Sequence, residues 1–276
     1  MVVRLLALDL DGTILEQGRV ISSQVIVALR ALDAAGVRCT TATGRPFRFQ
    51  AGLFARHGLG ADGSQGLFPH ALTVDEREIF WLDRVARAYV PHRPWNDAVR
   101  TRWDPLHPVA MTWLEQARHE AAQRAWPSSL PFSADEMYRR GLPTIAFANP
   151  DHAAGIEQWL QAQLVEHEPR LTCNRNVRLV QIHDAQVGKG SVLAEIARLW
   201  ALAPDEVLAI GDSANDFSML DGRLGFRCAA TGNADAAIKE AVRRAGGYVA
   251  EGHSGAGVVE ALRHYATALG ALQYAV

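Results

Sequence analysis

Cysteine is scarce in this chain of 276 residues, and its placement argues against two kinds of small scaffold. The three cysteines, Cys39, Cys173 and Cys228, lie far apart and follow no CxxC or Cys/His ligand spacing. An odd number of isolated cysteines fits neither a disulfide framework nor a structural zinc site. We therefore expect three small buried side chains in a reducing compartment.

A strong excess of either charge is also absent. The formal net charge is −2, so the overall balance indicates neither a nucleic-acid partner nor an anionic membrane. Arginines and tryptophans cluster between residues 81 and 103, but without a nucleic-acid-binding motif we interpret this stretch as a solvated face over an aromatic core. The ten histidines show neither HxH nor HExxH spacing, so we assign none to a metal.

Long hydrophobic runs are missing as well. The first apolar run begins at Val2 and reaches an acidic residue at Asp9. Such a run is too short to span a membrane and does not resemble a signal peptide. We therefore expect a soluble, cytoplasmic protein that binds neither membrane nor nucleic acid.

Strands and helices alternate near both ends of the sequence. An apolar run at 2–8 is followed by a stretch with helical spacing at 22–36 and by a β-rich segment at 37–43. The same rhythm returns after Gly188, with a helix pattern and then an apolar run at 207–210. Strand, helix and strand in succession indicate a parallel sheet with right-handed crossovers.

The middle of the sequence has a different composition. Six of the seven tryptophans fall between residues 81 and 159. Helix patterns at 108–126 and 150–167 are separated from alternating, hairpin-like strands at 171–184, which is typical of a small α+β domain. We predict an α/β fold: a doubly wound, Rossmann-like parallel core of residues 1–82 and 186–276, with an α+β cap of residues 83–185 inserted into it.

Acidic residues follow two of the expected core strands. Asp9 and Asp11 end the first strand two positions apart, and Asp212 and Asp216 follow the apolar run at 207–210. Each pair alone would be typical of an ordinary loop. The carboxyl ends of parallel strands, however, meet at one edge of the sheet, and this edge is where ligands usually bind. Four carboxylates in one small space are costly without a cation, and such an oxygen-rich site suits Mg²⁺.

Two further stretches suit an anionic ligand. Lys189 lies between two glycines at an expected helix N-terminus, and Thr43 precedes the backbone amides of Gly44 and Arg45. Taken singly, Lys189 reads as a solvated surface lysine and Thr43 as a helix cap. Together with the acidic stretches they indicate a phosphate pocket.

These stretches resemble the motifs of a known enzyme superfamily. DLDGT, TATGR, GKG and GDSANDFSML are similar to the four motifs of the haloacid dehalogenase-like (HAD) superfamily. The layout resembles its Cof-type phosphatases, which carry a large inserted α+β cap of type IIB, and TGNADAAIKEA is similar to that subgroup as well. One stretch departs from the pattern, because ADGSQGLF around Asp62 and Gly63 stands where those relatives usually show Asn-Gly-Ala.

The resemblance implies catalytic and metal-binding roles for four aspartates. Asp9 would be the nucleophile that attacks phosphorus, and Asp11 would be the general acid and later the general base. Mg²⁺ would be held by the side chains of Asp9 and Asp212 and by the backbone carbonyl of Asp11. Asp216 would act as a further ligand or support the others.

The resemblance also implies a set of phosphate-binding residues. Thr43, Gly44 and Lys189 would grip the transferring phosphoryl group, with Asn215 assisting. Arg45 would either touch the phosphate or form a surface ion pair.

The expected function is Mg²⁺-dependent hydrolysis of a small phosphorylated metabolite, such as a sugar phosphate, through an aspartyl-phosphate intermediate. The same motifs would also serve a phosphosugar mutase or other phosphotransferase. A non-catalytic phospholigand-binding protein is the third hypothesis. The sequence specifies neither the substrate, nor the cap residues that select it, nor the oligomeric state.

Overall fold

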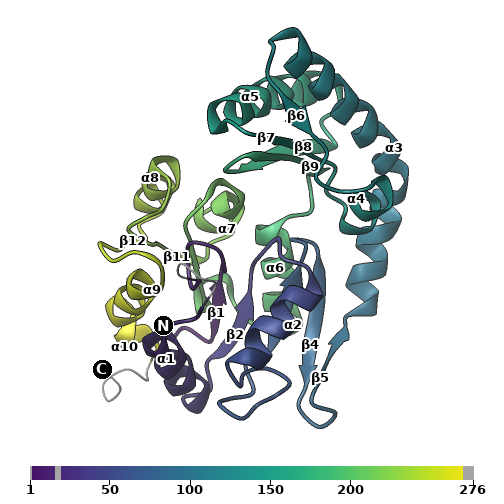
Figure 1. Cartoon of the computed structure of the whole chain (residues 1–276). Coiled ribbons are helices and arrows are strands. Elements are labelled where there is room, and N and C mark those ends of the chain that lie inside the picture. The colour runs from purple at the N-terminus through teal and green to yellow at the C-terminus, as the bar shows by residue number, and fades with distance from the viewer. Residues whose placement is uncertain (1, 16–19, 270–276) are drawn as a thin grey trace. The chain divides into compact units, whose positions relative to one another are not determined.

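The structure, a computed structural model, describes residues 2–15 and 20–269 (Figure 1). The chain divides into two compact units, one made of Met1–Arg93 with Lys189–Val276 and the other of Pro94–Gly188. The first core segment ends at Arg93, whereas the sequence analysis placed its end at residue 82. The second core segment begins at Lys189, whereas the sequence analysis placed its start at residue 186. The shift arises because the strand at Ala88–Pro91 pairs with the core sheet.

The core unit is built on an eight-stranded sheet in the order β12-β11-β10-β1-β2-β3-β4-β5. Its strands are β1 (Leu5–Leu8), β2 (Arg38–Thr41), β3 (Ala71–Val74), β4 (Glu78–Asp83), β5 (Ala88–Pro91), β10 (Val207–Gly211), β11 (Arg227–Ala230) and β12 (Tyr248–Val249). All pairs from β12 to β3 are parallel, and β4 and β5 add an antiparallel edge. The central strands β1 and β10 are buried along their whole length, as apolar strands covered on both faces must be.

Helices cover both faces of this sheet. They are α1 (Ser23–Ala34), α2 (Phe47–Arg56), α6 (Lys189–Leu199), α7 (Phe217–Leu220), α8 (Ala236–Arg244), α9 (Ser254–His264) and α10 (Ala266–Leu269), with short 3-10 turns η1 (Pro204–Glu206) and η2 (Ala214–Asp216). α1 contacts α9, whereas α6 contacts α7 and α7 contacts α8. Right-handed crossovers on the two sides of β1 place these groups on opposite faces, and Figure 1 shows α2 in front of the sheet and α6 behind it. The predicted doubly wound α/β core is confirmed.

The second unit is a small α+β domain. Its four-stranded antiparallel sheet has the order β6-β7-β9-β8, formed by β6 (Ser128–Ser129), β7 (Thr144–Phe147), β8 (Leu171–Asn176) and β9 (Leu179–Asp184). The helices are α3 (Arg93–Gln123), α4 (Ala134–Arg140) and α5 (Pro150–His167). Asn149 caps the N-terminus of α5, since its side-chain oxygen accepts a hydrogen bond from the backbone N–H of Asp151 at 2.9 Å.

The helix α3 begins at Arg93, whereas the sequence pattern predicted a start at position 108. It continues through Pro105 and Pro108. Its buried side chains are Asn96, Val99, Trp103, Leu106, Ala110, Leu114, Ala117 and Ala121. These positions recur every three or four residues, so one apolar stripe spans both prolines and the tertiary contacts outweigh the local preference to end a helix there.

None of the helices in the described ranges 2–15 and 20–269 is long and apolar enough to cross a membrane.

Candidate active site

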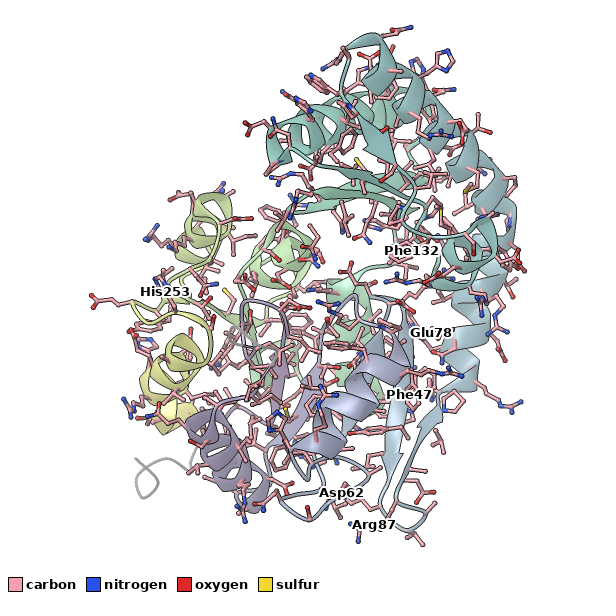
Figure 2. All side chains as sticks on the ribbon, viewed as in Figure 1. Phe47, Asp62, Glu78, Arg87, Phe132 and His253 are labelled. Carbon is pink, nitrogen blue, oxygen red and sulfur yellow. The ribbon has the colours of Figure 1, made fainter. Side chains whose placement is uncertain are left out.

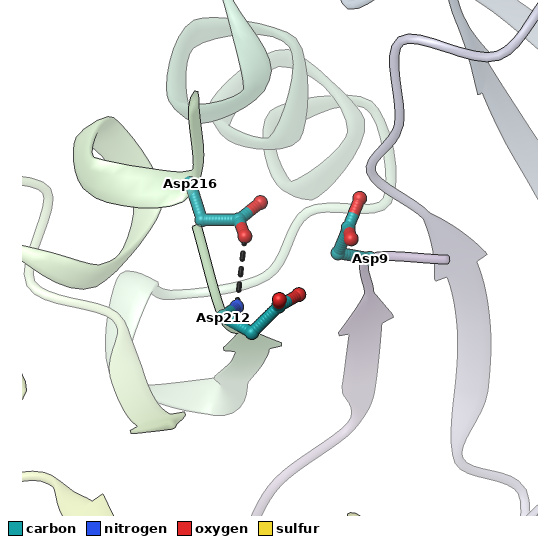
Figure 3. A group of neighbouring side chains, drawn as sticks. All are labelled: Asp9, Asp212 and Asp216. Atoms are coloured by element: carbon teal, nitrogen blue, oxygen red, sulfur yellow. Dashed lines mark hydrogen bonds between the residues drawn. The ribbon is translucent and has the colours of Figure 1, made fainter. Parts of the chain in front are cut away.

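Two neighbouring parallel strands bring the acidic residues together. β1 and β10 pair with Leu8 opposite Ile210, and the N–H of Asp9 continues the ladder by donating to the carbonyl of Ile210 at 3.0 Å. Asp212 follows β10 directly, and Asp216 lies in η2. One oxygen from each of these three carboxylates lies within 4.8 Å of the others, and Figure 3 shows the three side chains converging.

A buried lysine pairs with two of these carboxylates. The Nζ of Lys189, the first residue of α6, donates to Asp9 Oδ1 at 2.7 Å and to Asp216 Oδ1 at 2.6 Å. Burial alone would lower its pKa, but the charges of Asp216, Asp9 and Glu76 outweigh burial and raise that pKa above its ordinary value. Lys189 is therefore a permanent cation at the centre of the cluster, not the solvated surface lysine of the alternative interpretation.

One cation does not balance the acids around it. Burial, together with the charges of Asp216 and Asp212, raises the pKa of Asp9 well above its usual range, even though Lys189 acts in the opposite direction. Burial and the charge of Asp216 raise the pKa of Asp212 to about 7. The cluster is therefore short of positive charge, which is the condition that favours binding of a divalent cation.

Backbone and side-chain donors fix the two acidic loops. Asp216 Oδ2 accepts the N–H groups of Asp212 and Ser213 at 2.9 and 3.0 Å, and the hydroxyl of Thr13 donates to Asp212 Oδ1 at 2.7 Å. Gly12 adopts a φ of +81°, and a Cβ there would lie 2.3 Å from Asp212 Oδ2. Only glycine can therefore make the turn between the first strand and this carboxylate.

The remaining predicted phosphate-binding residues lie around one further acidic side chain. Asn215 Nδ2 donates to Glu76 Oε1 at 2.7 Å. The carbonyl of the buried Thr43 accepts the N–H of Glu76 at 3.1 Å, and a Cβ on Gly44 would lie 3.1 Å from Glu76 Oε1. The structure thus places Thr43, Gly44 and Asn215 beside one residue, Glu76, that the sequence analysis did not single out.

Asp11 and Arg45 form an ion pair of their own. Arg45 donates from Nε to Asp11 Oδ2 at 2.7 Å and from Nη2 to Asp11 Oδ1 at 2.6 Å, and its guanidinium lies 4.5 Å from the centre of the Phe49 ring. The hydrogen bond to Asp11 raises the pKa of Arg45. The structure thus shows the ion-pair alternative for Arg45, and its contact with phosphate stays a prediction.

The glycine-rich stretch around Asp62 lies far from this cluster. Arg87, in the turn between β4 and β5, donates to the carbonyl of Asp62, and Figure 2 shows the two residues together, with Glu78 at the other end of β4. The segment at the carboxyl end of β3 is instead the turn 75–77. The departure noted at ADGSQG therefore does not lie at the site, and the turn with Glu76 takes that place.

The two glycines that flank Lys189 differ in the space around them. A Cβ on Gly190 would lie 2.4 Å from the backbone carbonyl oxygen of Ser218, whereas a Cβ on Gly188 would meet nothing within 4 Å. We expect Gly190→Ala to lower the free energy of unfolding by about 1–3 kcal/mol or more, the usual cost of overpacking a close contact. Gly188→Ala is the matched control and should change it little. Chemical denaturation of both variants checks this, and equal stabilities would contradict the close contact at Gly190.

The family model for haloacid dehalogenase-like hydrolases matches residues 6–61 and 119–262. These segments hold 56 and 144 residues, which is more than half of the 276. The chain belongs to the haloacid dehalogenase-like hydrolase family. The resemblance noted in the four motifs is confirmed.

Two proteins with similar sequences are phosphatases by name. The chain is 25% identical to the phosphoglycolate phosphatase of Methanoculleus marisnigri, over 95% of this chain and 97% of that protein. It is 27% identical to the pyridoxal phosphate phosphatase YbhA of Escherichia coli, over 87% of this chain and 91% of that protein. The prediction that the chain is an enzyme, of the class of phosphoric monoester hydrolases, is confirmed.

Solved structures of two phosphatases share the fold along nearly the whole chain. The sucrose-phosphatase of Synechocystis sp. PCC6803, solved with sucrose and phosphate, superposes with a TM-score of 0.67 at 17% identity, over 99% of this chain and 100% of that one. A sugar phosphatase of HAD subclass IIB gives a TM-score of 0.60 at 17% identity, over 95% and 99% of the two chains. At such low identity these similarities establish the fold alone.

Proposed function

We propose that this HAD-family hydrolase is a Mg²⁺-dependent phosphatase that cleaves a small phosphate monoester through a phosphoryl group carried by Asp9. The observation that carries the proposal is that one oxygen each of Asp9, Asp212 and Asp216 lies within 4.8 Å of the others. The buried Nζ of Lys189 pairs with two of these carboxylates, those of Asp9 and Asp216. The names of similar proteins support the substrate class, because phosphoglycolate and pyridoxal phosphate are both small phosphate monoesters.

The acidic cluster fits a magnesium ion by its donor set. Every ligand that the family resemblance implies is oxygen: the side chains of Asp9 and Asp212, the carbonyl of Asp11, and Asp216 as ligand or support. Mg²⁺ prefers such carboxylate-rich sites that keep some water. The excess of buried negative charge described above is an independent reason to expect a cation here. When bound, Mg²⁺ would supply positive charge to the phosphoryl oxygens.

In the first half-reaction an oxygen of Asp9 attacks phosphorus and displaces the alcohol of the monoester. The bond from phosphorus to the leaving oxygen breaks, and that oxygen takes a proton from Asp11. Lys189 and the donors of the Thr43–Gly44 loop bind the non-bridging oxygens, where negative charge develops. The covalent intermediate accelerates hydrolysis because it replaces one difficult step with two easier displacements.

In the second half-reaction water attacks the same phosphorus. Asp11, now a carboxylate, takes a proton from that water, and the bond between phosphorus and the Asp9 oxygen breaks to release inorganic phosphate. Arg45 donates to both oxygens of Asp11 in the structure, so this ion pair must open before Asp11 can carry the proton that it gives to the leaving oxygen. The end state restores Asp9 as a carboxylate and Asp11 as an acid.

The metal prediction can be tested without any substrate. Mg²⁺ should raise the melting temperature of the wild-type protein, because the cation binds the folded state only. Asp212→Asn should abolish most of this increase. It should also make the metal-free protein more stable than the wild type, since one of the crowded buried carboxylates is neutralised.

Asp97→Asn is the matched control for this experiment, because the Asp97 side chain is 64% exposed in the second unit. It should keep the full effect of Mg²⁺. An undiminished Mg²⁺ effect in Asp212→Asn would contradict the assigned metal site. Differential scanning calorimetry with and without a chelator measures all three proteins.

The function itself is tested by phosphate release from a panel of phosphorylated metabolites. The panel should contain phosphoglycolate, pyridoxal phosphate and several sugar phosphates, each with Mg²⁺ and with a chelator. We expect Mg²⁺-dependent release from at least one compound. Interconversion of sugar phosphates without release would instead indicate the mutase hypothesis, and no reaction with any compound would count against the proposal.

A further inference from the structure

The turn between β3 and β4 has an unusual backbone for its residue types. Asp75 and Glu76 adopt φ values of 50° and 59°. These values lie in the left-handed region, which residues with a side chain rarely adopt and which glycine adopts without steric cost. Two consecutive non-glycine residues in this region cost folding free energy. Such backbone strain is found mainly at functional sites, where the side chain contributes to binding or catalysis. The turn lies at the carboxyl end of β3, next to the acidic cluster.

Glu76 connects two loops of the site, one through its side chain and one through its backbone. Its carboxylate is buried, with the residue 4% exposed, and it accepts the hydrogen bond from Asn215 Nδ2. Its backbone N–H donates to the carbonyl of Thr43. One residue therefore touches both the loop after β2 and the loop after β10.

Charge pairing with Lys189 does not account for this carboxylate. Lys189 forms its ion pairs with Asp9 and Asp216, at 2.7 and 2.6 Å, and Glu76 acts on it only through a more distant charge. A further buried acid beside an anion-binding pocket is electrostatically unfavourable. Some other gain must offset that cost, and the hydrogen bond to Asn215 is the specific contact that removal of the carboxylate would break.

The chemistry of that hydrogen bond fixes the orientation of an amide. An ionised carboxylate only accepts hydrogen bonds, so Asn215 must turn its nitrogen toward Glu76. The hydroxyl of Ser213 donates to Asn215 Oδ1 at 2.6 Å and fixes the other end of the amide. Nδ2 carries a second N–H, which in this orientation is a donor suited to a phosphoryl oxygen. A flipped amide would present its oxygen, which repels an anion.

We propose that Glu76 is a positioning residue of the phosphate pocket: its carboxylate holds the Asn215 amide with the nitrogen, not the oxygen, toward the phosphoryl group. The inference rests on the proposed phosphatase function. It goes beyond the four motifs, because Glu76 lies in none of them.

The variant that isolates this role is Glu76→Gly. Glycine suits a φ of 59°, so the fold should be retained or become more stable, and the backbone N–H to Thr43 remains. We expect kcat/KM to fall by about tenfold to a hundredfold, the value of one hydrogen bond to a charged group. Glu76→Gln keeps an acceptor oxygen for Asn215 and should stay within about threefold of the wild type.

A double-mutant cycle tests whether Glu76 acts through Asn215. Asn215→Ala alone should lose about as much as Glu76→Gly, and the double variant should lose no more than Asn215→Ala alone. Arg87→Gly is the matched backbone control, since Arg87 has a φ of 50° in the turn at the other end of β4. It should leave turnover unchanged. The same proteins are compared by calorimetric binding of inorganic phosphate with Mg²⁺ and by melting temperature.

Three outcomes would overturn the inference: wild-type turnover in Glu76→Gly, fully multiplicative losses in the double variant, or a folded Glu76→Gln as impaired as Glu76→Gly. None of these affects the proposed function, which wild-type phosphate release tests separately. If the wild type releases no phosphate, the proposed function fails, and the phosphate affinities still decide the role of Glu76. Equal phosphate affinities in the wild type and Glu76→Gly would then count against it.

Discussion

Replacing Asp9 with Asn should abolish Mg²⁺-dependent turnover of p-nitrophenyl phosphate. The amide has nearly the shape of the carboxylate but cannot attack phosphorus, so kcat should fall by at least about four orders of magnitude, as for other nucleophile replacements. Lys189 keeps its second partner, Asp216, at 2.6 Å. Burial and neighbouring acids already disfavour the charged form of Asp9, so loss of that charge should not lower the melting temperature.

The matched control is Asp97→Asn, which removes an exposed carboxylate in the second unit and should leave turnover unchanged. Steady-state assays and thermal melts of the three proteins check both parts of the prediction. Full activity in Asp9→Asn would exclude Asp9 as the nucleophile. Loss of activity together with loss of the folded state would show a structural role for the carboxylate.

Replacing Lys189 with Met should damage both stability and activity. The methionine has a similar length but leaves Asp9 and Asp216 buried without their cation. Removing one partner of a buried ion pair usually costs about 3–5 kcal/mol, and phosphate binding would lose its main side-chain charge. Mg²⁺ should restore part of the lost stability, because it supplies positive charge to the same carboxylates.

The chain provides a control for Lys189→Met, since its only other lysine is Lys239. Lys239 Nζ donates to the carbonyl of Gly232 at 2.5 Å, a single hydrogen bond to a neutral group. Lys239→Met should therefore cost much less than Lys189→Met in chemical denaturation. Equal costs would mean that the buried pairs of Lys189 contribute no more than one such hydrogen bond.

The centre of the site could be predicted because it follows from strand geometry. Apolar runs that end in Asp9 and in Gly211–Asp212 predict parallel strands, and the carboxyl ends of such strands share one edge. Their adjacency in the sheet then brings together residues about 200 positions apart. A further signal was available but unused: a lysine is rare in this chain, so the choice of Lys at 189 instead of Arg is itself informative.

Glu76 could not be predicted from the sequence because its contacts are not periodic. The sequence DER between two strands is typical of an ordinary turn. Asn215, the hydrogen-bond partner of Glu76, is 139 positions away. The pairing of Arg45 with Asp11 was open for a similar reason, since a loop arginine can reach several neighbouring acids. Such contacts depend on the path of each loop, which local sequence patterns do not specify.

The domain boundary shows how tertiary pairing overrides composition. Trp81 opens the tryptophan-rich stretch that indicated the inserted domain, yet it lies in β4 of the core sheet. Its ring lies 5.1 Å from that of Trp200, which also belongs to the core unit. The tryptophan count therefore located the inserted domain only approximately.

The most direct test of the covalent mechanism uses the Asp11→Asn variant in its first turnover. p-Nitrophenolate leaves phosphorus without needing a proton, so Asp9 can still be phosphorylated, but the attacking water then lacks its base. Rapid mixing with p-nitrophenyl phosphate and Mg²⁺ should release a burst of about one p-nitrophenolate per enzyme, followed by slow turnover. Acid-quenched protein should carry phosphate on the peptide that contains Asp9. Steady release without a burst and without protein-bound phosphate would contradict the mechanism.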